Sequence, residues 1–376
     1  MPAAPSPRAA VTIVAHDIGP VGGMERVLSE LIAGLRAGGH DVTVIARTCV
    51  LPPGPGVRFR RVRGPARPFL IAYPWFMVAG TLATWRGRRG AVQPTGAIIL
   101  NRVDVVSVHY CHHAGPTNPS RPTMLFRAHS RLAGMLSRAG ERLVYGRNRQ
   151  AWFACVSDGV AEEMRTHFPF LGGRVVTVRN GVDTSSFRPE AAAGCEHALR
   201  ASLGVEDSRL LAIFVGGEWE RKGLAAAIEA LAQAPEWHLL VVGPGDQRHF
   251  AAHAASLGLG ERVHFAGVRA DVPALYPIAD AFVLPTSYET FSLATYEAAA
   301  SGLPLLATPV NGVRELIVEG VNGYFISRRP EEIAARLREL GEDGQLRRRL
   351  GDAARQSSLE FGWERSVEAY ERLYVG

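Results

Sequence analysis

The sequence predicts two α/β domains, each a doubly wound parallel sheet with helices on its faces. A chain of 376 residues is longer than one hydrophobic core usually spans. Short apolar runs alternate with segments of helical periodicity, as they do in α/β folds. The charge also changes sign half-way along the chain. Residues 1–188 hold 24 arginines and 10 acidic residues, a balance of +14, which leaves −8 for the rest of a chain of net charge +6.

The first half opens with a strand, a helix and a second strand. Residues 10–15 form an apolar run suited to a buried parallel strand, and residues 42–46 form the next one. Between them, apolar residues recur at helical spacing from Met24 until Gly38 and Gly39 end the helix. Further strands are predicted at residues 97–100, 105–108, 152–156 and 175–178.

The second half starts the same pattern again after a linker-like segment near residues 184–205. Its first strand ends in Gly216-Gly217 and its second in Gly243-Pro244-Gly245, so both strands lead into tight loops. Strands are predicted at residues 210–215, 238–242, 281–285 and 303–308, with a helix at about 223–232.

Residues 68–85 depart from this pattern because they contain no charged side chain and are flanked by arginines on both sides. A membrane-spanning helix needs about 20 residues, and Pro68, Pro74 and Gly80 are poorly placed in one. Two interpretations remain open. The segment is either a helix, or a pair of short ones, resting in the membrane interface with Trp and Arg at the headgroup level, or a core helix with a solvated basic flank.

The cysteines point to a reducing compartment. They are far apart in the sequence and show neither the paired spacing of a metal site nor the density of a disulfide framework. The chain also shows no secretory leader. We therefore expect a cytoplasmic protein. The residues are Cys49, Cys111, Cys155 and Cys195.

The strongest functional signal is the segment 287–304, which follows a buried strand, crosses a polar loop and enters a helix. Ligands of open α/β sheets bind at such strand ends. Free N–H groups at the start of the helix, together with its dipole, favour an anion there. Carboxylates also accept hydrogen bonds from sugar hydroxyls, so Glu289 and Glu297 are candidates for that role. The loop residues predicted to face the ligand are Thr290, Phe291, Ser292 and Leu293.

This segment resembles the signature of retaining glycosyltransferases of the GT-B fold, glycosyltransferase family 4. The two glutamates are separated by seven residues, with Phe-Ser-Leu after the first and Ala-Ala-Ala-Ser-Gly-Leu-Pro after the second. The resemblance extends over nearly the whole chain. The other similar segments are residues 22–26 (the glycine loop of the first domain), 180–183 (Asn-Gly-Val-Asp, between the domains), 214–223 (the diphosphate-binding segment) and 361–363 (the crossover helix).

One departure from the family pattern concerns the diphosphate-binding segment. Most members carry an Arg where this chain has Gly217, and a Lys five residues later; here the cations are adjacent, Arg221 and Lys222. This variant resembles the lipopolysaccharide-core glucosyltransferases. Lys222 is the single lysine of an arginine-rich chain, which argues against an exposed pair of no function at a helix start.

The resemblance implies a division of labour among these residues. Glu297 holds the ribose of the nucleotide, and Glu289 holds hydroxyls of the transferred sugar. Charge developing on the departing diphosphate must be stabilised, and Arg221, Lys222 and the helix N-terminus supply what a metal ion supplies in other glycosyltransferases. No Asp-x-Asp motif for a metal occurs in the sequence, so no metal and no cofactor are expected. Same-face attack is the expected retaining mechanism; Glu289 as a nucleophile is the alternative.

His109 ends a strand of the first domain and resembles the active-site histidine of the family, which contacts the donor sugar. His112 is its competitor, and a structural role for His109 is also open. The neighbouring histidines and Cys111 do not make a zinc site, because no second cluster supports one.

Weaker candidates complete the predicted site. Gly22 and Gly23 lack dinucleotide-binding spacing but form a loop through which backbone amides can approach a phosphate or an acceptor. Gly245 borders the nucleotide by the same reasoning, and the resemblance places Arg269 near the base. For each glycine, a plain turn is the alternative.

Together these features predict a two-domain enzyme. Residues 1–186, with a crossover helix at 361–376, are expected to bind the acceptor, and residues 187–360 the nucleotide-diphosphate sugar, across a cleft. The basic first domain favours an anionic or membrane-bound acceptor, such as a lipid, polyisoprenyl phosphate or saccharide of the cell envelope. Nucleic acid is not expected, since no nucleic-acid-binding motif accompanies the charge. The alternatives are a sugar-nucleotide epimerase or a phosphorylase of the same fold, or a non-catalytic membrane or nucleic-acid binder.

Overall fold

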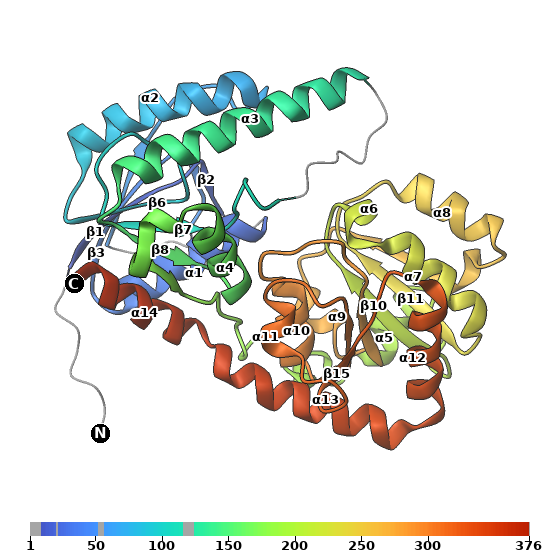
Figure 1. Ribbon diagram of the computed structural model, residues 1–376. Helices are drawn as coiled ribbons and strands as arrows, with labels where there is room; N and C mark the ends of the chain where they lie inside the picture. Colours follow the sequence, from blue (N-terminus) through green and yellow to red (C-terminus); the bar gives the residue numbers. More distant parts are fainter. Residues whose placement is uncertain (1–8, 20–21, 52–55, 116–123, 376) are drawn as a thin grey trace. The chain divides into compact units, whose positions relative to one another are not determined.

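The computed structural model describes residues 9–19, 22–51, 56–115 and 124–375, and the chain divides into two compact units. Unit 1 comprises Met1–Gly181 and Trp363–Gly376, and unit 2 comprises Val182–Gly362. The chain therefore changes units between residues 181 and 182 and returns between 362 and 363, whereas the sequence suggested 186 and 360. Each unit is an α/β layer structure (Figure 1).

Unit 1 is built on parallel strands in the spatial order β5-β3-β1-β6, continued by β7-β8-β9. An isolated bridge between Thr95 and Ser107 joins the two sets of strands. The strands are β1 (Ala10–Val14), β2 (Asp17–Ile18), β3 (Asp41–Ala46), β4 (Thr48–Cys49), β5 (Val57–Arg61), β6 (Ala91–Pro94), β7 (Val105–Val108), β8 (Trp152–Cys155) and β9 (Val175–Thr177). The short strands β2 and β4 pair with each other beside the main sheet.

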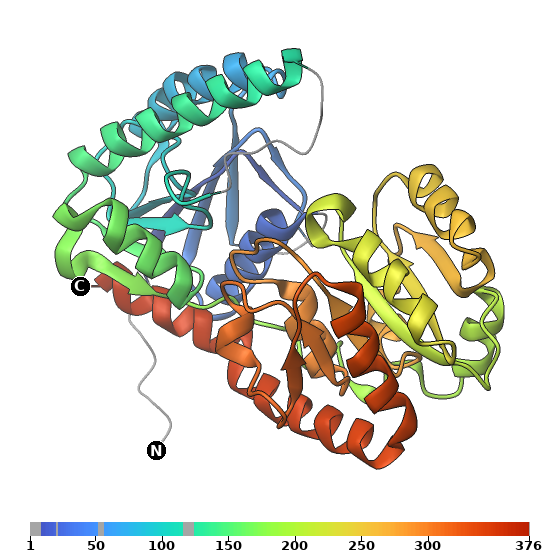
Figure 2. The same ribbon diagram turned by 45° about the vertical axis from the view of Figure 1, so that its right-hand side comes forward.

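Helices cover both faces of this sheet. Figures 1 and 2 show α2 and α3 side by side on one face, with α1 and α14 on the other. The helices are α1 (Gly23–Ala37), α2 (Phe69–Gly87), α3 (Met124–Arg147), α4 (Asp158–His167) and α14 (Trp363–Val375), with a 3₁₀ turn η1 (Pro169–Arg174). The core of the second face joins strands β1 and β3 to buried residues of α1 and to Val367 and Tyr370 of α14. The crossover helix is thus part of the core of unit 1.

Unit 2 has parallel strands in the order β12-β11-β10-β13-β14-β15, the doubly wound order of dinucleotide-binding folds. The strands are β10 (Leu210–Val215), β11 (Trp237–Val242), β12 (Val263–Gly267), β13 (Ala281–Leu284), β14 (Leu305–Ala307) and β15 (Gly323–Phe325). The helices are α5 (Glu196–Ser202), α6 (Trp219–Lys222), α7 (Leu224–Ala230), α8 (Gln247–Ser256), α9 (Val272–Leu275), α10 (Leu293–Ala300), α11 (Val313–Leu316), α12 (Pro330–Glu342) and α13 (Gly344–Ser358). Four 3₁₀ turns, η2 (Pro189–Ala192), η3 (Leu231–Gln233), η4 (Gly260–Arg262) and η5 (Leu359–Phe361), belong to the described part of this unit.

The predicted strand at residues 97–100 is wrong. The strand on that edge of β1 is β6, which ends at Pro94, and residues 97–100 form no ladder. These residues are apolar because α2 covers them: Tyr73 donates to the carbonyl oxygen of Ala97 (2.6 Å), and the Leu100 amide donates to Thr81 (2.8 Å). An apolar run alone does not distinguish a buried loop from a buried strand.

The predicted helix at 223–232 is confirmed as α7, which the 3₁₀ turn η3 continues to Gln233. A separate short helix, α6, precedes it, and Gly223 separates α6 from α7 with a positive φ of 80°. The carbonyl oxygen of Pro285 lies where a β-carbon of residue 223 would be. Only glycine adopts this conformation at such close approach, so the interruption is a property of the sequence.

Residues 68–85 fold as one helix rather than two, because α2 runs without a break through Pro74. None of the described helices is long and apolar enough to span a bilayer.

Candidate functional site

The sheet order of unit 2 creates a switch point between β10 and β13. The chain winds from β10 through β11 to β12 on one side, and then continues from β13 through β14 to β15 on the other. Loops that leave neighbouring strands in opposite directions open a crevice at the carboxyl ends of those strands. Lys222 ends α6, which follows β10, and Glu289 lies in the loop after β13. The two predicted residues therefore meet at this point.

Close backbone approach shapes the loop after β10. Gly216 has φ 137°, and a β-carbon there would lie 2.8 Å from the Cε atom of Lys222. A β-carbon on Gly243, where φ is 122°, would lie 2.5 Å from the carbonyl oxygen of Gly216. Any side chain at Gly216 would therefore displace the lysine. The glycines predicted at the strand ends leave the space that the Lys222 side chain occupies at the end of β10.

Two cations converge on one carboxylate oxygen. The Nζ atom of Lys222 donates to Oε1 of Glu289 at 2.8 Å, and a guanidinium nitrogen of Arg221 donates to the same oxygen at 3.1 Å. The hydroxyl of Thr286 donates to Oε1 as well, at 3.3 Å. Arg221 also binds Glu218 (2.7 Å) and the carbonyl oxygen of Tyr288. All these bonds to Glu289 end on Oε1, which leaves Oε2 available as an acceptor.

The cluster is largely removed from water, which strengthens its electrostatics. The side chains of Lys222 and Glu289 are each 11% exposed. Burial alone would raise the pKa of Glu289, but Lys222 and Arg221 outweigh it and lower the pKa below its usual range. Burial likewise disfavours the charged form of Arg221, yet Glu289 and Glu218 raise its pKa. Glu289 and Arg221 are therefore charged at neutral pH.

The start of α10 presents backbone donors beside this cluster. Ser292 occupies the left-handed region (φ 73°, ψ 67°), with its hydroxyl 2.7 Å from the hydroxyl of Thr295. Phe291 is buried and stacks on Tyr296 at 4.1 Å. In the described part of the chain, no hydrogen bond uses the amides of Phe291, Ser292 or Leu293 as donors. Unpaired amides at a helix start form an anion-binding position.

The second glutamate is held separately. Glu297 lies inside α10 and is buried, and its Oε2 accepts a hydrogen bond from the hydroxyl of Tyr276 at 2.9 Å. The same hydroxyl also contacts the carbonyl oxygen of Ala294 (3.2 Å). Tyr276 follows α9, so the side chain that orients Glu297 comes from a different loop.

The remaining predicted residues of unit 2 occupy neighbouring loops. Gly217 packs against Pro244, and Gly245 lies against the indole of Trp219, which is buried. Thr290 is half-buried between Glu289 and Phe291. Arg269 is bound by Asp271 through two hydrogen bonds (2.8 and 2.6 Å), and this partner raises the pKa of Arg269. The structure therefore gives the guanidinium of Arg269 a carboxylate partner of its own.

His109 of unit 1 follows β7 and is held by a hydroxyl relay. Its Nε2 lies 3.0 Å from the hydroxyl of Ser107, which lies 2.8 Å from the hydroxyl of Tyr370 on α14. Burial lowers the pKa of His109 to about 4, so the ring is neutral at physiological pH. The crossover helix thus orients the predicted histidine from within unit 1.

His112 and His113 both form hydrogen bonds to the carboxylate of Glu141. The amide of His112 donates to Oε1 of Glu141 (2.9 Å), and Nδ1 of His113 lies 2.7 Å from Oε2 of the same residue. Burial raises the pKa of Glu141 to about 7. The ring of His112 is exposed and leans on Tyr110. Among the described residues, no group of three or more His, Cys, Asp or Glu side chains is arranged to hold a metal ion.

The glycine loop of unit 1 is described from Gly22 onward. Gly22 caps α1 with φ 99°, and its carbonyl oxygen accepts from the amide of Arg26 (3.2 Å). Gly22 and Gly23 are both exposed, and the carboxylate of Glu25 lies against Gly22, where a β-carbon of that residue would be.

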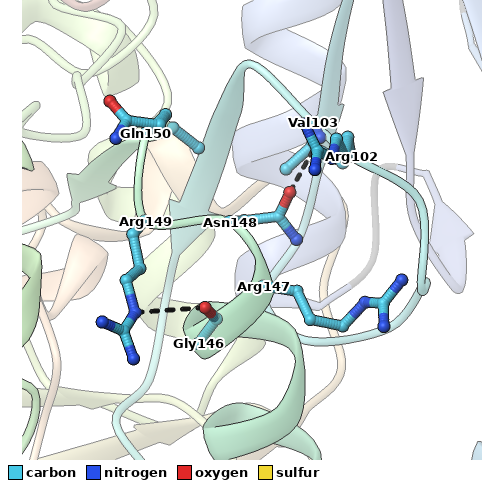
Figure 3. Close-up of a pocket in the computed structure, with 8 residues that line it drawn as sticks. Arg102, Val103, Gly146, Arg147, Asn148, Arg149 and Gln150 are labelled. Carbon is cyan, nitrogen blue, oxygen red and sulfur yellow. Dashed lines mark hydrogen bonds between the residues drawn. The ribbon is translucent and has the colours of Figure 1, made fainter.

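A cavity of about 200 Å³ lies at the amino-terminal ends of β7 and β8, whereas His109 follows the carboxyl end of β7. Figure 3 shows that Asn148 points across it to the amide of Val103 (3.0 Å), whereas Arg147 and Arg149 extend in opposite directions. These side chains do not converge on one point. The cavity therefore offers no built site for a ligand.

Sequence reasoning missed three supporting residues. Tyr276 orients Glu297, Thr286 binds Glu289, and Tyr370 holds the relay to His109. No motif marks them, because each acts through tertiary contact. The only available signal was Thr286, three residues before Glu289 at the end of an apolar run.

Comparison with known proteins assigns both units. Residues 21–186 match the family described as Glycosyltransferase Family 4, and residues 196–357 match the family described as Glycosyl transferases group 1. The chain is a glycosyltransferase of the GT-B fold. The two matches fall in unit 1 and unit 2 almost entirely, so each unit of this glycosyltransferase carries one of its two family domains.

Relatives of this glycosyltransferase include three curated proteins. The uncharacterized glycosyltransferase MJ1607 of Methanocaldococcus jannaschii is 26% identical over 94% of each chain. A D-inositol 3-phosphate glycosyltransferase of Streptomyces avermitilis is 25% identical over 95% of this chain and 83% of its own. The lipopolysaccharide glucosyltransferase WaaG of Escherichia coli is 28% identical, but the match covers 62% of this chain and only 60% of WaaG.

Solved structures share the fold. The crystal structure of WaaG, a glycosyltransferase involved in lipopolysaccharide biosynthesis, superposes with a TM-score of 0.83 at 22% identity, covering 97% of this chain and all of that one. Anabaena HepE in complex with UDP-glucose has a TM-score of 0.71 at 20% identity, covering 97% and 100%. At this level of identity the likeness establishes the fold alone.

Proposed function

We propose that this glycosyltransferase moves a sugar from a nucleotide-diphosphate sugar, with retention and without a metal ion, to an anionic or membrane-associated lipid or saccharide of the cell envelope. One observation carries the proposal: Lys222 and Arg221 converge on Glu289 at the switch point of the sheet. A buried pair of cations suits a diphosphate, and a carboxylate beside them suits the hydroxyls of the sugar that the diphosphate carries.

The donor class follows from charge and from relatives. The cations and the unpaired amides at the start of α10 lie in loops of the same strand edge, and both favour a dianionic group. The fold neighbour HepE was solved with UDP-glucose. Glu297, already oriented by Tyr276, is the acceptor we assign to the ribose hydroxyls.

The same cations support the proposed metal independence. In catalysis the diphosphate oxygens gain negative charge as the glycosidic bond breaks, and fixed donors aimed at that charge lower the barrier. Lys222 and Arg221 can supply this stabilisation directly. Turnover should be unchanged in the presence of EDTA, and loss of turnover on chelation, restored by a divalent cation, would refute this part of the proposal.

Retention by same-face attack is supported by the state of Glu289. Its Oε1 accepts three hydrogen bonds, two from cations, which lower the pKa of the carboxyl. Such charge-assisted bonds reduce the nucleophilicity of a carboxylate, so binding the sugar suits Glu289 better than attacking it. Proton NMR of the first-formed product should show the anomeric configuration of the donor.

His109 is the residue of unit 1 to which we assign a contact with the donor sugar. Because burial lowers its pKa to about 4, the ring is neutral and can donate or accept one hydrogen bond with the sugar without adding charge. The acceptor is assigned to unit 1 because of that unit's positive charge. One relative is named for D-inositol 3-phosphate and another for lipopolysaccharide, and a basic surface would attract either kind of anionic acceptor.

The experiment that tests the proposal is a thermal-shift panel of UDP-, GDP-, ADP- and dTDP-sugars. A ligand at 100 times its dissociation constant stabilises the folded state by about 2.7 kcal/mol. We expect one nucleotide class to raise the melting temperature, and we expect Lys222→Ala to lose that response. Stabilisation by no nucleotide sugar would refute the proposal.

A further inference from the structure

Helix α2 has a second apolar face that the core of unit 1 does not use. Its buried residues include Tyr73, Phe76 and Gly80, which pack toward the sheet. A row of large apolar side chains, spaced alternately four and three residues apart, lies on the opposite side of the helix, as the period of an α-helix requires. We call this row the α2 stripe: Ile71, Trp75, Val78, Leu82 and Trp85, each 47–68% exposed.

Helix α3 continues this surface. Leu132, Met135 and Leu143 are 50–60% exposed and lie on one side of α3; we call them the α3 stripe. The hydroxyl of Tyr73 lies where a β-carbon of Gly140 would be, so α2 and α3 approach closely. Figures 1 and 2 show the two helices side by side on one face of the sheet. Both stripes therefore face outward from the same layer.

The charge around the stripes is almost entirely positive. Residues 42–157 contain 17 arginines, no lysine and two carboxylates, Asp104 and Glu141. Asp104 accepts from the amide of Val92 (2.8 Å), and Glu141 is buried. Neither carboxylate forms an ion pair with an arginine in the described structure.

Arginines border both stripes. At the ends of α2 they are Arg61, Arg63, Arg67, Arg86 and Arg88, and along one side of the α3 stripe they are Arg131, Arg138 and Arg142. In the residues that the structure describes, none of these eight takes part in an ion pair. The surface thus combines exposed apolar side chains with arginines that form no ion pair in the described structure, although Arg138 lies near enough to the buried Glu141 to lower its pKa.

We propose that the α2 and α3 stripes form a docking face that lies in the interface of an anionic phospholipid bilayer. This deepens the proposed function and rests on it, because a membrane-associated acceptor requires the enzyme at the membrane. The apolar rows enter the boundary of the acyl chains, while the arginines reach the phosphate headgroups. A helix of 19 residues is about 28 Å long and lies along the surface.

Charge decides between a bilayer and a second copy of the chain. Two copies paired through this face would bring two sets of arginines together, with two carboxylates per copy, one of them buried and the other bound to a backbone amide. An anionic lipid surface supplies the missing counter-charges, and each arginine near it strengthens binding by roughly fivefold.

The first test is vesicle sedimentation of the full chain. We expect binding to vesicles of phosphatidylcholine with one quarter phosphatidylglycerol, and binding at least tenfold weaker to phosphatidylcholine alone. The triple variant Ile71→Ser/Val78→Ser/Trp85→Ser should bind at least about 27-fold more weakly, from a loss of at least about threefold for each apolar side chain. The matched control is Val318→Ser/Val321→Ser in unit 2, whose side chains are 56% and 53% exposed, and it should bind like the wild type.

A charge variant tests the arginines separately. Arg131→Gln/Arg142→Gln should weaken binding to anionic vesicles by about 25-fold, from roughly fivefold per charge, and leave the weak binding to neutral vesicles unchanged. Arg348→Gln, an exposed arginine of α13, is the control. Equal effects of the two variants would overturn the assignment of this face.

Tryptophan fluorescence locates the contact. Trp75 and Trp85 are 53% and 68% exposed, while Trp219 and Trp237 are buried. Lipids with brominated acyl chains should quench the emission of the wild type, and Trp75→Phe/Trp85→Phe should abolish most of the quenching. Quenching that survives this double substitution would overturn the proposal.

Other outcomes separate this inference from the proposed function. Hydrolysis of the donor without vesicles should be equal in the stripe variants and the wild type. Vesicle binding without any response to nucleotide sugars would refute the proposed function and leave the docking face standing. The docking face would be overturned if the wild type did not bind vesicles. It would also be overturned if the wild type formed a dimer that the stripe variants abolish. Neither result would affect the proposed donor site.

Discussion

Replacing Lys222 by methionine removes one charge from the centre of the site and preserves the length of the side chain. The Nζ atom of Lys222 lies 2.8 Å from Oε1 of Glu289, and both side chains are 11% exposed. In the variant, Glu289 keeps Arg221 at 3.1 Å and Thr286 at 3.3 Å. The carboxylate loses one of its two cations but does not become isolated.

The magnitude follows from this geometry. Breaking a buried ion pair by removing one partner costs about 3–5 kcal/mol, and a hydrogen bond to a charged group contributes about 1.5–3 kcal/mol. Because Arg221 still neutralises Glu289, we expect the lower range, about 1.5–3 kcal/mol of unfolding free energy. For catalysis, loss of one donor to the developing charge costs about 100- to 1000-fold in kcat.

The assay is a double-mutant cycle of Lys222→Met and Glu289→Gln, with unfolding by urea and turnover of the donor both measured. If Lys222 only neutralises Glu289, the double variant should regain stability and turn over the donor at the rate of Glu289→Gln alone. If Lys222 also binds the diphosphate, as we propose, the double variant regains part of the stability and turns over the donor more slowly than Glu289→Gln alone. Turnover of Lys222→Met within threefold of the wild type would refute the reasoning.

Three further predictions concern other parts of the site. Tyr276→Phe removes the donor to Glu297 and should raise KM for the donor several-fold, with a stability loss of about 1–2 kcal/mol in urea unfolding. Because the folded pKa of Glu289 is lowered, its ionisation contributes stability that is present above its unfolded pKa near 4.5 and is lost as the pH falls through the folded value. The stability difference between wild type and Glu289→Gln should therefore shrink below pH 4.5, and a constant difference from pH 7 to 3 would contradict this. Gly223→Ala should destabilise by at least about 1–2 kcal/mol, because the β-carbon meets the carbonyl oxygen of Pro285 at a positive φ of 80°, and should lower donor turnover, because residue 223 directly follows Lys222; a melting temperature equal to the wild type would contradict it.

Local patterns were sufficient where a local rule operates. Apolar runs marked β1, β3, β7, β8 and β9 in unit 1 and β10, β11, β13 and β14 in unit 2, because buried parallel strands are continuously apolar. The strands β12 and β15 were not predicted. The same rule failed at residues 97–100, which are apolar for burial under α2 and not for pairing. Helical periodicity did not predict α6, because its four residues make little more than one turn.

The site divides in the same way. The sequence was enough to predict that Glu289, Lys222 and the glycines at the strand ends lie together, because the segments that follow neighbouring parallel strands meet at one edge of the sheet. The pairing of both cations with a single carboxylate oxygen required coordinates. The pairing of Arg269 with Asp271 also required coordinates, and it gives Arg269 a partner within its own loop.

For residues 68–85 the sequence left two interpretations, a helix in the membrane interface and a core helix, and the structure shows a helix with two apolar faces. One face packs on the sheet, and the other exposes the α2 stripe. The sequence by itself determined the two α/β units and the residue types gathered at their strand ends, because strand periodicity and loop position are local properties. Only the tertiary structure decided which side chains orient the functional ones and which apolar faces stay uncovered, because such contacts join residues such as Tyr370 and Ser107 that lie far apart in the chain.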